Sequence, residues 1–323
     1  MSRITRFNLV LAIGIVLAML VSLGIGKIWV PWGEWGSDDP RWLIVTELRL
    51  PRILLAAVVG AGLGLSGAAM QGYLRNPLAD PGLFGVSAGA ALGAVISLYF
   101  GYAASAWLLP LFALAGAAGA MALLALLVGR SASIIVFTLA GVILSSVAGS
   151  MTALAISLAP TPFATAQIVT WLMGALTDRS WADVWIAMPI IAVGSVLLAM
   201  TARSLDALTL GEDAARSMGV DPLRLQVLIV LGVGLCVGAA VATAGVIGFI
   251  GLMVPHLVRP FAGHRPSAVL LPSALGGALL LVLADALVRG MPTVSELRLG
   301  IAMAMLGGPF FLVLLLKMRR GLA

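Results

Sequence analysis

Long apolar runs separated by short polar segments dominate this chain. A helix that crosses a bilayer core about 30 Å thick needs about 20 apolar residues, and about ten runs of that kind lie between charges, prolines and aromatic residues. The predicted spans are Asn8–Gly26, Arg52–Gln71, Gly85–Tyr102, Trp107–Val128, Ser133–Leu158, Trp181–Met200, Leu225–Ala242, Gly245–Phe261, Val269–Val288 and Leu299–Leu316. The eighth run contains Pro255 and ends in charge, which predicts a short or broken helix.

Composition agrees with this pattern. The mean hydropathy is +1.13 and only 10% of the 323 residues are charged, whereas soluble domains carry about 25%. We therefore predict an all-α integral membrane protein with about ten transmembrane helices in a single domain, residues 1–323. Arg3 and Arg6 precede the first run, but no small-residue cleavage pattern follows it, so we interpret it as a helix and not as a signal peptide.

The charge distribution predicts the orientation. With both termini in the cytoplasm, the inner segments hold 12 of the 19 basic residues and five acidic ones, a balance of +7. The outer segments hold seven basic and seven acidic residues when Asp285 is counted inside a span. An excess of Lys and Arg marks the cytoplasmic side. Orientation thus accounts for the net charge of +6, and no nucleic-acid partner is needed.

Catalytic and metal-binding motifs are not found. His256 and His264 are the only histidines and form no zinc motif, while Lys27 and Lys317 complete no phosphate-binding loop. Cys236 is the single cysteine, which excludes an intrachain disulfide and a thiolate metal site. We therefore expect no metal, no cofactor and no enzymatic activity in this chain.

Asp285 is the only ionisable residue well inside a predicted span, and it precedes Arg289 by four residues. That spacing puts both side chains on one helix face. One interpretation is a helix-end ion pair or a contact to a neighbouring helix. The alternative is a proton relay in a proton-coupled secondary transporter. For a third hypothesis, an intramembrane enzyme, there are no paired carboxylates and no nucleophile constellation.

A polar segment, residues 203–222, lies between the sixth and seventh spans and is therefore predicted to be cytoplasmic. Ser204 is a candidate cap for a first short helix, Gly211 begins a second, and Gly219 ends it. Helical spacing places four apolar residues on one stripe, namely Leu205, Leu208, Ala215 and Met218. Such a stripe fits a groove on a soluble partner, and the alternative is a solvated loop.

Prolines predict two structural features on the same inner face. The segment from Arg75 to Gly82 forms a rigid turn built from Asn76, Pro77, Asp80 and Pro81. Pro255 is interpreted as a helix break near that face.

Four segments carry a family resemblance: "LRLPRILLAAVVGAGLGLSGAAMQGYLRNPLADPGLFGVSAGAALG", "LDALTLGEDAARSMGV", "GVIGFIGLMVPHLVR" and "LLPSALGGALLLVLADALVR". In this order they closely resemble the iron-siderophore, haem and cobalamin permeases of bacterial ATP-binding cassette (ABC) importers, over nearly the whole chain. The resemblance implies a permease in the bacterial inner membrane, with a second permease subunit as a homodimer or as a paired heterodimer. It also implies two ATPase subunits that bind ATP and Mg, and a periplasmic binding protein.

The resemblance also implies roles for particular residues. The segment 203–222 would couple to the ATPase through Leu210, Gly211, Glu212, Asp213, Ala215, Arg216, Met218 and Gly219. The turn at 75–82 is interpreted as architectural, and its place on the same inner face makes it a second candidate contact. Arg49, Arg52 and Arg289 would dock glutamates of the binding protein. The alternative is that these arginines anchor helix ends or pair with Glu47, Asp285 or Glu296.

The family's cytoplasmic gate matches Gly129–Phe137, in which Ser133 is followed by Ile134 and Ile135. Cobalamin relatives are more polar here, and an apolar gate closes by excluding water. This departure weakens the assignment of cobalamin but does not select between siderophores and haem. The cargo that we expect is a ferric siderophore first, haem second and cobalamin third. The sequence does not name the chelate.

Overall fold

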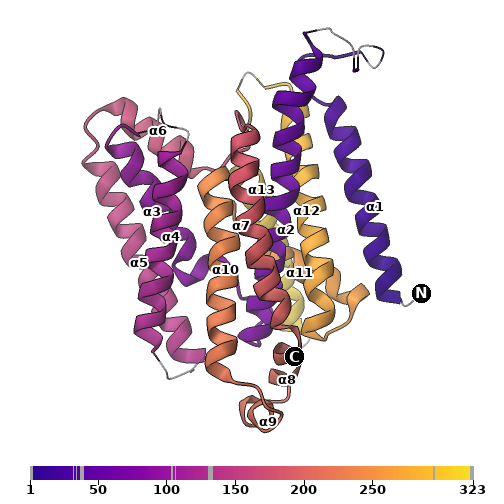
Figure 1. The fold of residues 1–323 in the computed structure, drawn as a ribbon, viewed down its shortest axis with the longest axis vertical. Coiled ribbons are helices and arrows are strands. Elements are labelled where there is room, and N and C mark those ends of the chain that lie inside the picture. Colours follow the sequence, from indigo (N-terminus) through magenta and orange to yellow (C-terminus); the bar gives the residue numbers. More distant parts are fainter. Residues whose placement is uncertain are drawn as a thin grey trace.

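The computed structural model describes residues 3–31, 33, 35–36, 40–102, 105, 107–129, 134–293 and 295–320, without the side chains of 83 and 317–320. This part of the chain is all helical (Figure 1). The α-helices are α1 (Arg3–Gly24), α2 (Leu50–Tyr73), α3 (Val86–Tyr99), α4 (Leu108–Val128), α5 (Ile134–Ser157), α6 (Pro162–Leu172), α7 (Trp181–Met200), α8 (Ala202–Leu208), α9 (Glu212–Ser217), α10 (Pro222–Ala244), α11 (Ile250–Ala262), α12 (Pro266–Gly290) and α13 (Leu299–Arg320). A π-helix, η2 (Ile44–Arg49), precedes α2, and a 3₁₀-helix, η3 (Pro81–Phe84), precedes α3.

Each predicted span coincides with one helix. In the described residues, eight helices are long and apolar enough to cross a membrane, and α3 and α11 are shorter apolar helices. The predicted all-α membrane fold is confirmed. The largest boundary errors are in the first span, where α1 begins at Arg3 and not at Asn8, and in the eighth, where residues 245–249 are not helical and α11 begins only at Ile250.

The helices form two groups beside each other (Figure 1). Helices α3 to α6 lie on one side, and α1, α2, α7 and α11 to α13 lie on the other, with α10 between them. Both termini and the pair α8–α9 lie at one end of the molecule, while α6 lies at the opposite end. The predicted orientation makes the first end cytoplasmic, and we call the two ends inner and outer.

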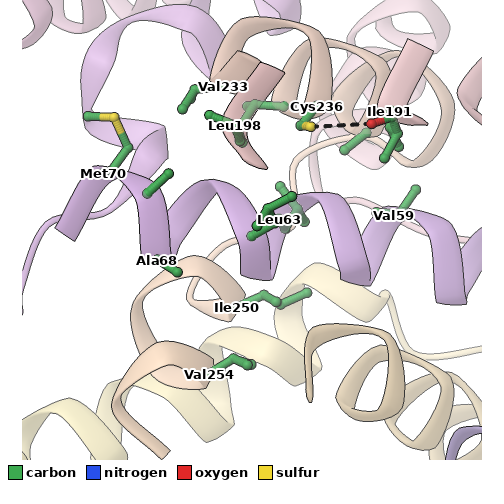
Figure 2. Packing of buried hydrophobic residues seen from close by; sticks show 14 of the residues in the cluster. Val59, Leu63, Ala68, Met70, Ile191, Leu198, Val233, Cys236, Ile250 and Val254 are labelled. Carbon is green, nitrogen blue, oxygen red and sulfur yellow. Dashed lines mark hydrogen bonds between the residues drawn. The ribbon is translucent and has the colours of Figure 1, made fainter. Parts of the chain in front are cut away.

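Helix α2 is the centre of the core and packs against α7, α10, α11 and α12. Figure 2 shows the buried side chains around it, which are Val59, Leu63, Ala68 and Met70 of α2, Ile191 and Leu198 of α7, Val233 and Cys236 of α10, and Ile250 and Val254 of α11. Glycines allow α2 and α12 to pack closely. A Cβ at Gly60 would strike the carbonyl oxygen of Gly277, and a Cβ at Gly277 would strike the carbonyl oxygen of Gly60. Small residues at such crossings allow the backbones of membrane helices to touch.

Pro255 does not break a helix, contrary to the prediction. It lies buried inside α11, where it cannot donate a hydrogen bond to the carbonyl of Gly251, four residues earlier. Gln71 of α2 donates instead, from Nε2 to the carbonyls of Gly251 at 3.2 Å and Leu252 at 3.3 Å. Because the amide satisfies the carbonyl that proline leaves free, the helix continues to Ala262.

Helix α6 was not predicted. Thr161 caps it by accepting a hydrogen bond from the Ala164 amide at 3.1 Å, and Pro162 is its first residue. A Thr-Pro pair at a helix start was the available signal.

Candidate functional site

The segment 203–222 folds as the two short helices predicted, although α8 already begins at Ala202, so Ser204 is inside it and does not cap it. Gly211 precedes α9 with a φ of +105°, and Gly219 follows it with a φ of +85°, which favour glycine at both ends. The amide of Val220 donates to the carbonyl of Ala215 at 3.0 Å and closes the turn. The segment is therefore an ordered projection at the inner end (Figure 1).

The predicted apolar stripe is divided between two faces. Leu205, Leu208 and Ala215 are buried against the chain itself, with Ala215 only 2% exposed. Leu210 and Met218 face outward, 67% and 63% exposed. The expectation that Ala215 enters a partner's groove is corrected, because its side chain anchors α9 to its own fold.

Two ion pairs hold the segment to the inner end of the bundle. Asp206 of α8 accepts hydrogen bonds from the Ser267 amide at 2.9 Å and hydroxyl at 2.6 Å, and pairs with Arg265 at 3.1 Å. Burial alone would raise the pKa of Asp206, but these Ser267 and Arg265 contacts hold that pKa below its usual value. On α9, Glu212 pairs with Arg75 at 3.4 Å.

The α9 helix lies beside the predicted gate. A narrow crevice of about 20 Å³ is lined by Glu212, Ala215 and Arg216 of this segment together with Ile134, the first residue of α5, and Tyr73. Ile135 points away from the chain and is 72% exposed. Ser133 lies outside the described residues.

An aromatic cluster fixes the start of α5. The ring of Phe137 is 1% exposed and lies 5.4 Å from the Tyr73 ring and 5.1 Å from the Phe84 ring, measured between centroids. The inner ends of α2 and α5 and helix η3 are thereby packed as one unit.

The segment 75–82 contains two local turns. The Asn76 side chain accepts a hydrogen bond from the amide of Leu78 at 2.9 Å, after Pro77. The Asp80 side chain accepts one from the amide of Gly82 at 2.7 Å, and Pro81 follows it as the first residue of η3. The turn therefore connects α2 directly to the aromatic cluster.

At the outer end, Arg52, Asp285, Arg289 and Glu296 form a buried charge cluster. Arg52 of α2 pairs with Asp285 of α12 at 2.8 Å and with Glu296 of the α12–α13 loop at 2.9 Å. Arg289 pairs with the other oxygen of Asp285 at 3.0 Å, so the interpretation of Asp285 and Arg289 as a helix-end ion pair is confirmed. Burial would raise the pKa of Glu296, but Arg52 and the Thr177 hydroxyl hold that pKa below its usual value.

The arginines also bind the end of α1. Arg289 donates to the carbonyls of Ser22 at 3.2 Å and Ile25 at 3.3 Å, and also to the Ser22 hydroxyl. Arg49 donates to the carbonyl of Leu23 at 2.6 Å and to that of Ile28. Cations suit a helix C-terminus, because its last carbonyls have no partner within the helix.

The proposed docking arginines are therefore not free surface charges. Arg49, Arg52 and Arg289 are only 5%, 8% and 6% exposed. They line the wall of an outer cavity of about 220 Å³, which Lys27 and Arg179 also line, with Asp178 and Glu296 as its acidic members. The lining thus holds five cations and two carboxylates, and Asp285 and Asp183 pair with Arg52, Arg289 and Arg179 from behind it.

Comparison with known proteins identifies the class. Residues 14–317 match the model of the FecCD transport family. The chain is 40% identical over 296 residues to the uncharacterised ABC transporter permease protein YvrB of Bacillus subtilis, covering 90% of this chain and 83% of that one. It is 39% identical over 320 residues to the vitamin B12 import system permease protein BtuC of Salmonella paratyphi A, covering 98% and 97%.

Solved structures agree on the fold. An inward-facing ABC transporter of the metal-chelate type superposes with a TM-score of 0.88 and 32% identity, covering 97% of this chain and 99% of that one. PsaBC from Streptococcus pneumoniae, with a TM-score of 0.54 and 18% identity, shares the fold alone.

This chain belongs to the FecCD transport family. It is a multi-pass permease subunit of an ABC importer in the bacterial inner membrane and is the non-catalytic component, since a separate ATPase binds ATP. The family excludes the proton-coupled alternative, and in this fold Asp285 is held between two arginines.

Proposed function

We propose that two copies of this chain form the membrane pathway of an importer for a metal chelate, a ferric siderophore first and haem second. Two ATPases would bind at the inner end and a periplasmic binding protein at the outer end. Residues 1–323 act as one permease domain, with 203–222 as its coupling segment.

The crevice shared by α9 and Ile134 carries this proposal. Residues of α9 and the first residue of α5 line the same crevice, so a displacement of α9 would change its shape at the start of α5. Leu210 and Met218 present apolar side chains outward from the segment, as a helix that docks into a partner's groove must. The ATPase would therefore hold Leu210 and Met218 and move the gate through Ala215.

A second copy would complete the gate. Ile135, Leu139 and Ile143 lie on α5 and are 72%, 58% and 57% exposed, so a single chain cannot seal a pathway with them. Apolar rings close by dewetting only when side chains face one another. We therefore propose that α5 of each copy lines the shared pathway and that Ile134 and Ile135, with Ser133, form the gate.

Docking of the binding protein would use the outer cavity. An incoming glutamate would enter beside Arg49, Arg52 and Arg289 and approach Lys27 at the exposed rim. Charge-assisted pairs of this kind set register and association rate. The exchange of Lys27 for Glu should slow association with the binding protein and leave folding unchanged, because Lys27 is exposed whereas the three arginines are not.

Vitamin B12 is the third candidate cargo. The specific observation for it is the 39% identity to permeases named for vitamin B12 import. The apolar pair Ile134–Ile135 weighs against vitamin B12 and does not choose between a siderophore and haem. Uptake of a radiolabelled ferric siderophore, of haem and of cyanocobalamin into proteoliposomes that contain the complete importer separates these candidates, and uptake of cyanocobalamin alone would contradict our first choice.

Coupling is tested by Met218→Asp and Leu210→Asp. Each should abolish co-purification of the ATPase while the melting temperature of the permease stays near that of the parent, since both side chains are exposed. Arg6→Asp at the inner end of α1 is the control for added negative charge. If both Leu210→Asp and Met218→Asp still bind the ATPase, the proposal that the ATPase docks on Leu210 and Met218 is refuted.

A further inference from the structure

A second cavity lies at the inner end, apart from the crevice beside α9 and from the outer cavity. It measures about 310 Å³ and is lined by the inner ends of α2, α11 and α12 and by Thr209, which follows α8. Its polar lining includes Arg75, Arg259 and His264, and among the described lining residues none is acidic. A volume near 300 Å³ is at the lower end for small-molecule sites.

Arg259 is held in place by a buried scaffold. Its Nη2 donates to Oε1 of Gln71 at 2.6 Å, and Gln71 is 2% exposed and fixed by two backbone carbonyls of α11. An arginine that only marks the cytoplasmic side needs no such support. A guanidinium whose rotamer is fixed by a neighbour is the arrangement expected of a binding group.

Arg75 connects this cavity to the coupling segment. It lines the cavity and also pairs with Glu212 of α9 at 3.4 Å, with the side chains 43% and 41% exposed. Exposed pairs of this kind contribute about 0–1 kcal/mol, so a stronger anion in the cavity would redirect Arg75 at little cost.

We propose that this cavity binds a phosphate group through Arg75, Arg259 and His264. Binding draws Arg75 away from Glu212 and so changes the orientation in which α9 meets the ATPase. Guanidinium groups bind phosphate oxygens through paired hydrogen bonds. The phosphate comes either from an anionic lipid headgroup of the inner leaflet or from the cytoplasm as a free anion.

The first arm of the test measures the free anion. Inorganic phosphate is titrated by calorimetry into the permease–ATPase complex in nanodiscs of phosphatidylcholine. We expect saturable binding that weakens about tenfold or more in Arg259→Gln, because a hydrogen bond to a charged group is lost. The matched control is Arg224→Gln, which removes an exposed inner arginine outside the cavity and should bind like the parent.

The second arm measures the lipid. Phosphatidylglycerol replaces part of the phosphatidylcholine, and native mass spectrometry counts the retained anionic lipids while the ATPase rate is recorded. If the lipid is the source, retention and the change in rate occur in the parent and in Arg224→Gln but not in Arg259→Gln. Arg75→Gln should keep partial binding and lose the change in rate, since it removes the link to Glu212.

Arg259→Lys is the control for misfolding. It keeps the positive charge, so it should recover part of the affinity for phosphate that Arg259→Gln loses. The proposal is overturned if neither phosphate nor phosphatidylglycerol binds in a manner that distinguishes Arg259→Gln from Arg224→Gln. It is also overturned if Arg259→Gln only weakens assembly with the ATPase, because the cavity would then hold an acidic side chain of that partner.

Discussion

The two ends of the molecule use the same residue types in opposite surroundings. At the outer end, Arg52, Asp285 and Arg289 are nearly inaccessible and each contacts more than one partner. At the inner end, Arg75 and Glu212 form a single pair that is more than 40% exposed on both sides. A buried charge that loses its partner is severely destabilising, whereas an exposed pair contributes little. The outer cluster therefore fixes structure, and the inner pair is free to exchange partners.

Asp285→Ala should have the largest effect. It leaves Arg52 and Arg289 buried without their shared carboxylate, and we expect a loss of about 3–5 kcal/mol of stability. Thermal unfolding of the detergent-solubilised permease measures it. Glu212→Ala is the matched control from the inner end, and equal shifts in melting temperature for the two variants would abolish the contrast between the ends.

Gln71→Leu should come next. It removes the amide donor to the Gly251 carbonyl and the acceptor of Arg259, at a cost of about 1–3 kcal/mol for buried groups left unpaired. Adding Pro255→Ala restores a backbone N–H four residues after Gly251, so the double variant should be more stable than Gln71→Leu alone. Strictly additive losses in the double-mutant cycle would show that the amide does not replace the missing backbone bond.

Asp206→Ala should have a smaller effect. It removes the carboxylate that accepts from the Ser267 amide at the start of α12, and loss of such a cap costs about 0.5–2 kcal/mol. Because the folded-state pKa of Asp206 is depressed, its contribution is present above the ordinary value of 3.8 and is lost as pH falls through the lower folded value. Parent and variant should therefore differ in stability at neutral pH and converge under strongly acidic conditions, and a difference that persists there would point to packing.

Glu212→Gln should have the smallest effect on stability, below about 1 kcal/mol, because its partner Arg75 is as exposed as Glu212 itself. Raising the salt concentration should erase even this difference. A larger, salt-independent loss in the unfolding midpoint would mean that α9 depends on this pair, and the inner end would then resemble the outer one.

Hydropathy was enough to predict the ten apolar helices, and periodicity with capping residues was enough to predict the two short helices of segment 203–222, because these signals are local in the sequence. It could not predict the role of Gln71, since nothing near this residue in sequence shows that it will meet the carbonyl freed by Pro255. The burial of Arg49, Arg52 and Arg289 also escaped prediction. Their partners lie on α1, on α12 and in the α12–α13 loop, and only the packing of distant segments brings them together.

Helix α12 joins the two ends in a mechanical sense. Its first turn is fastened to the coupling segment by Asp206 and Ser267, and its last turn is fastened to the outer cluster by Asp285 and Arg289. A helix of 25 residues is about 37 Å long and resists stretching along its axis. If the ATPases move α8, as the proposed coupling requires, α12 would transmit that shift to the outer cluster, because it is the helix tied to both.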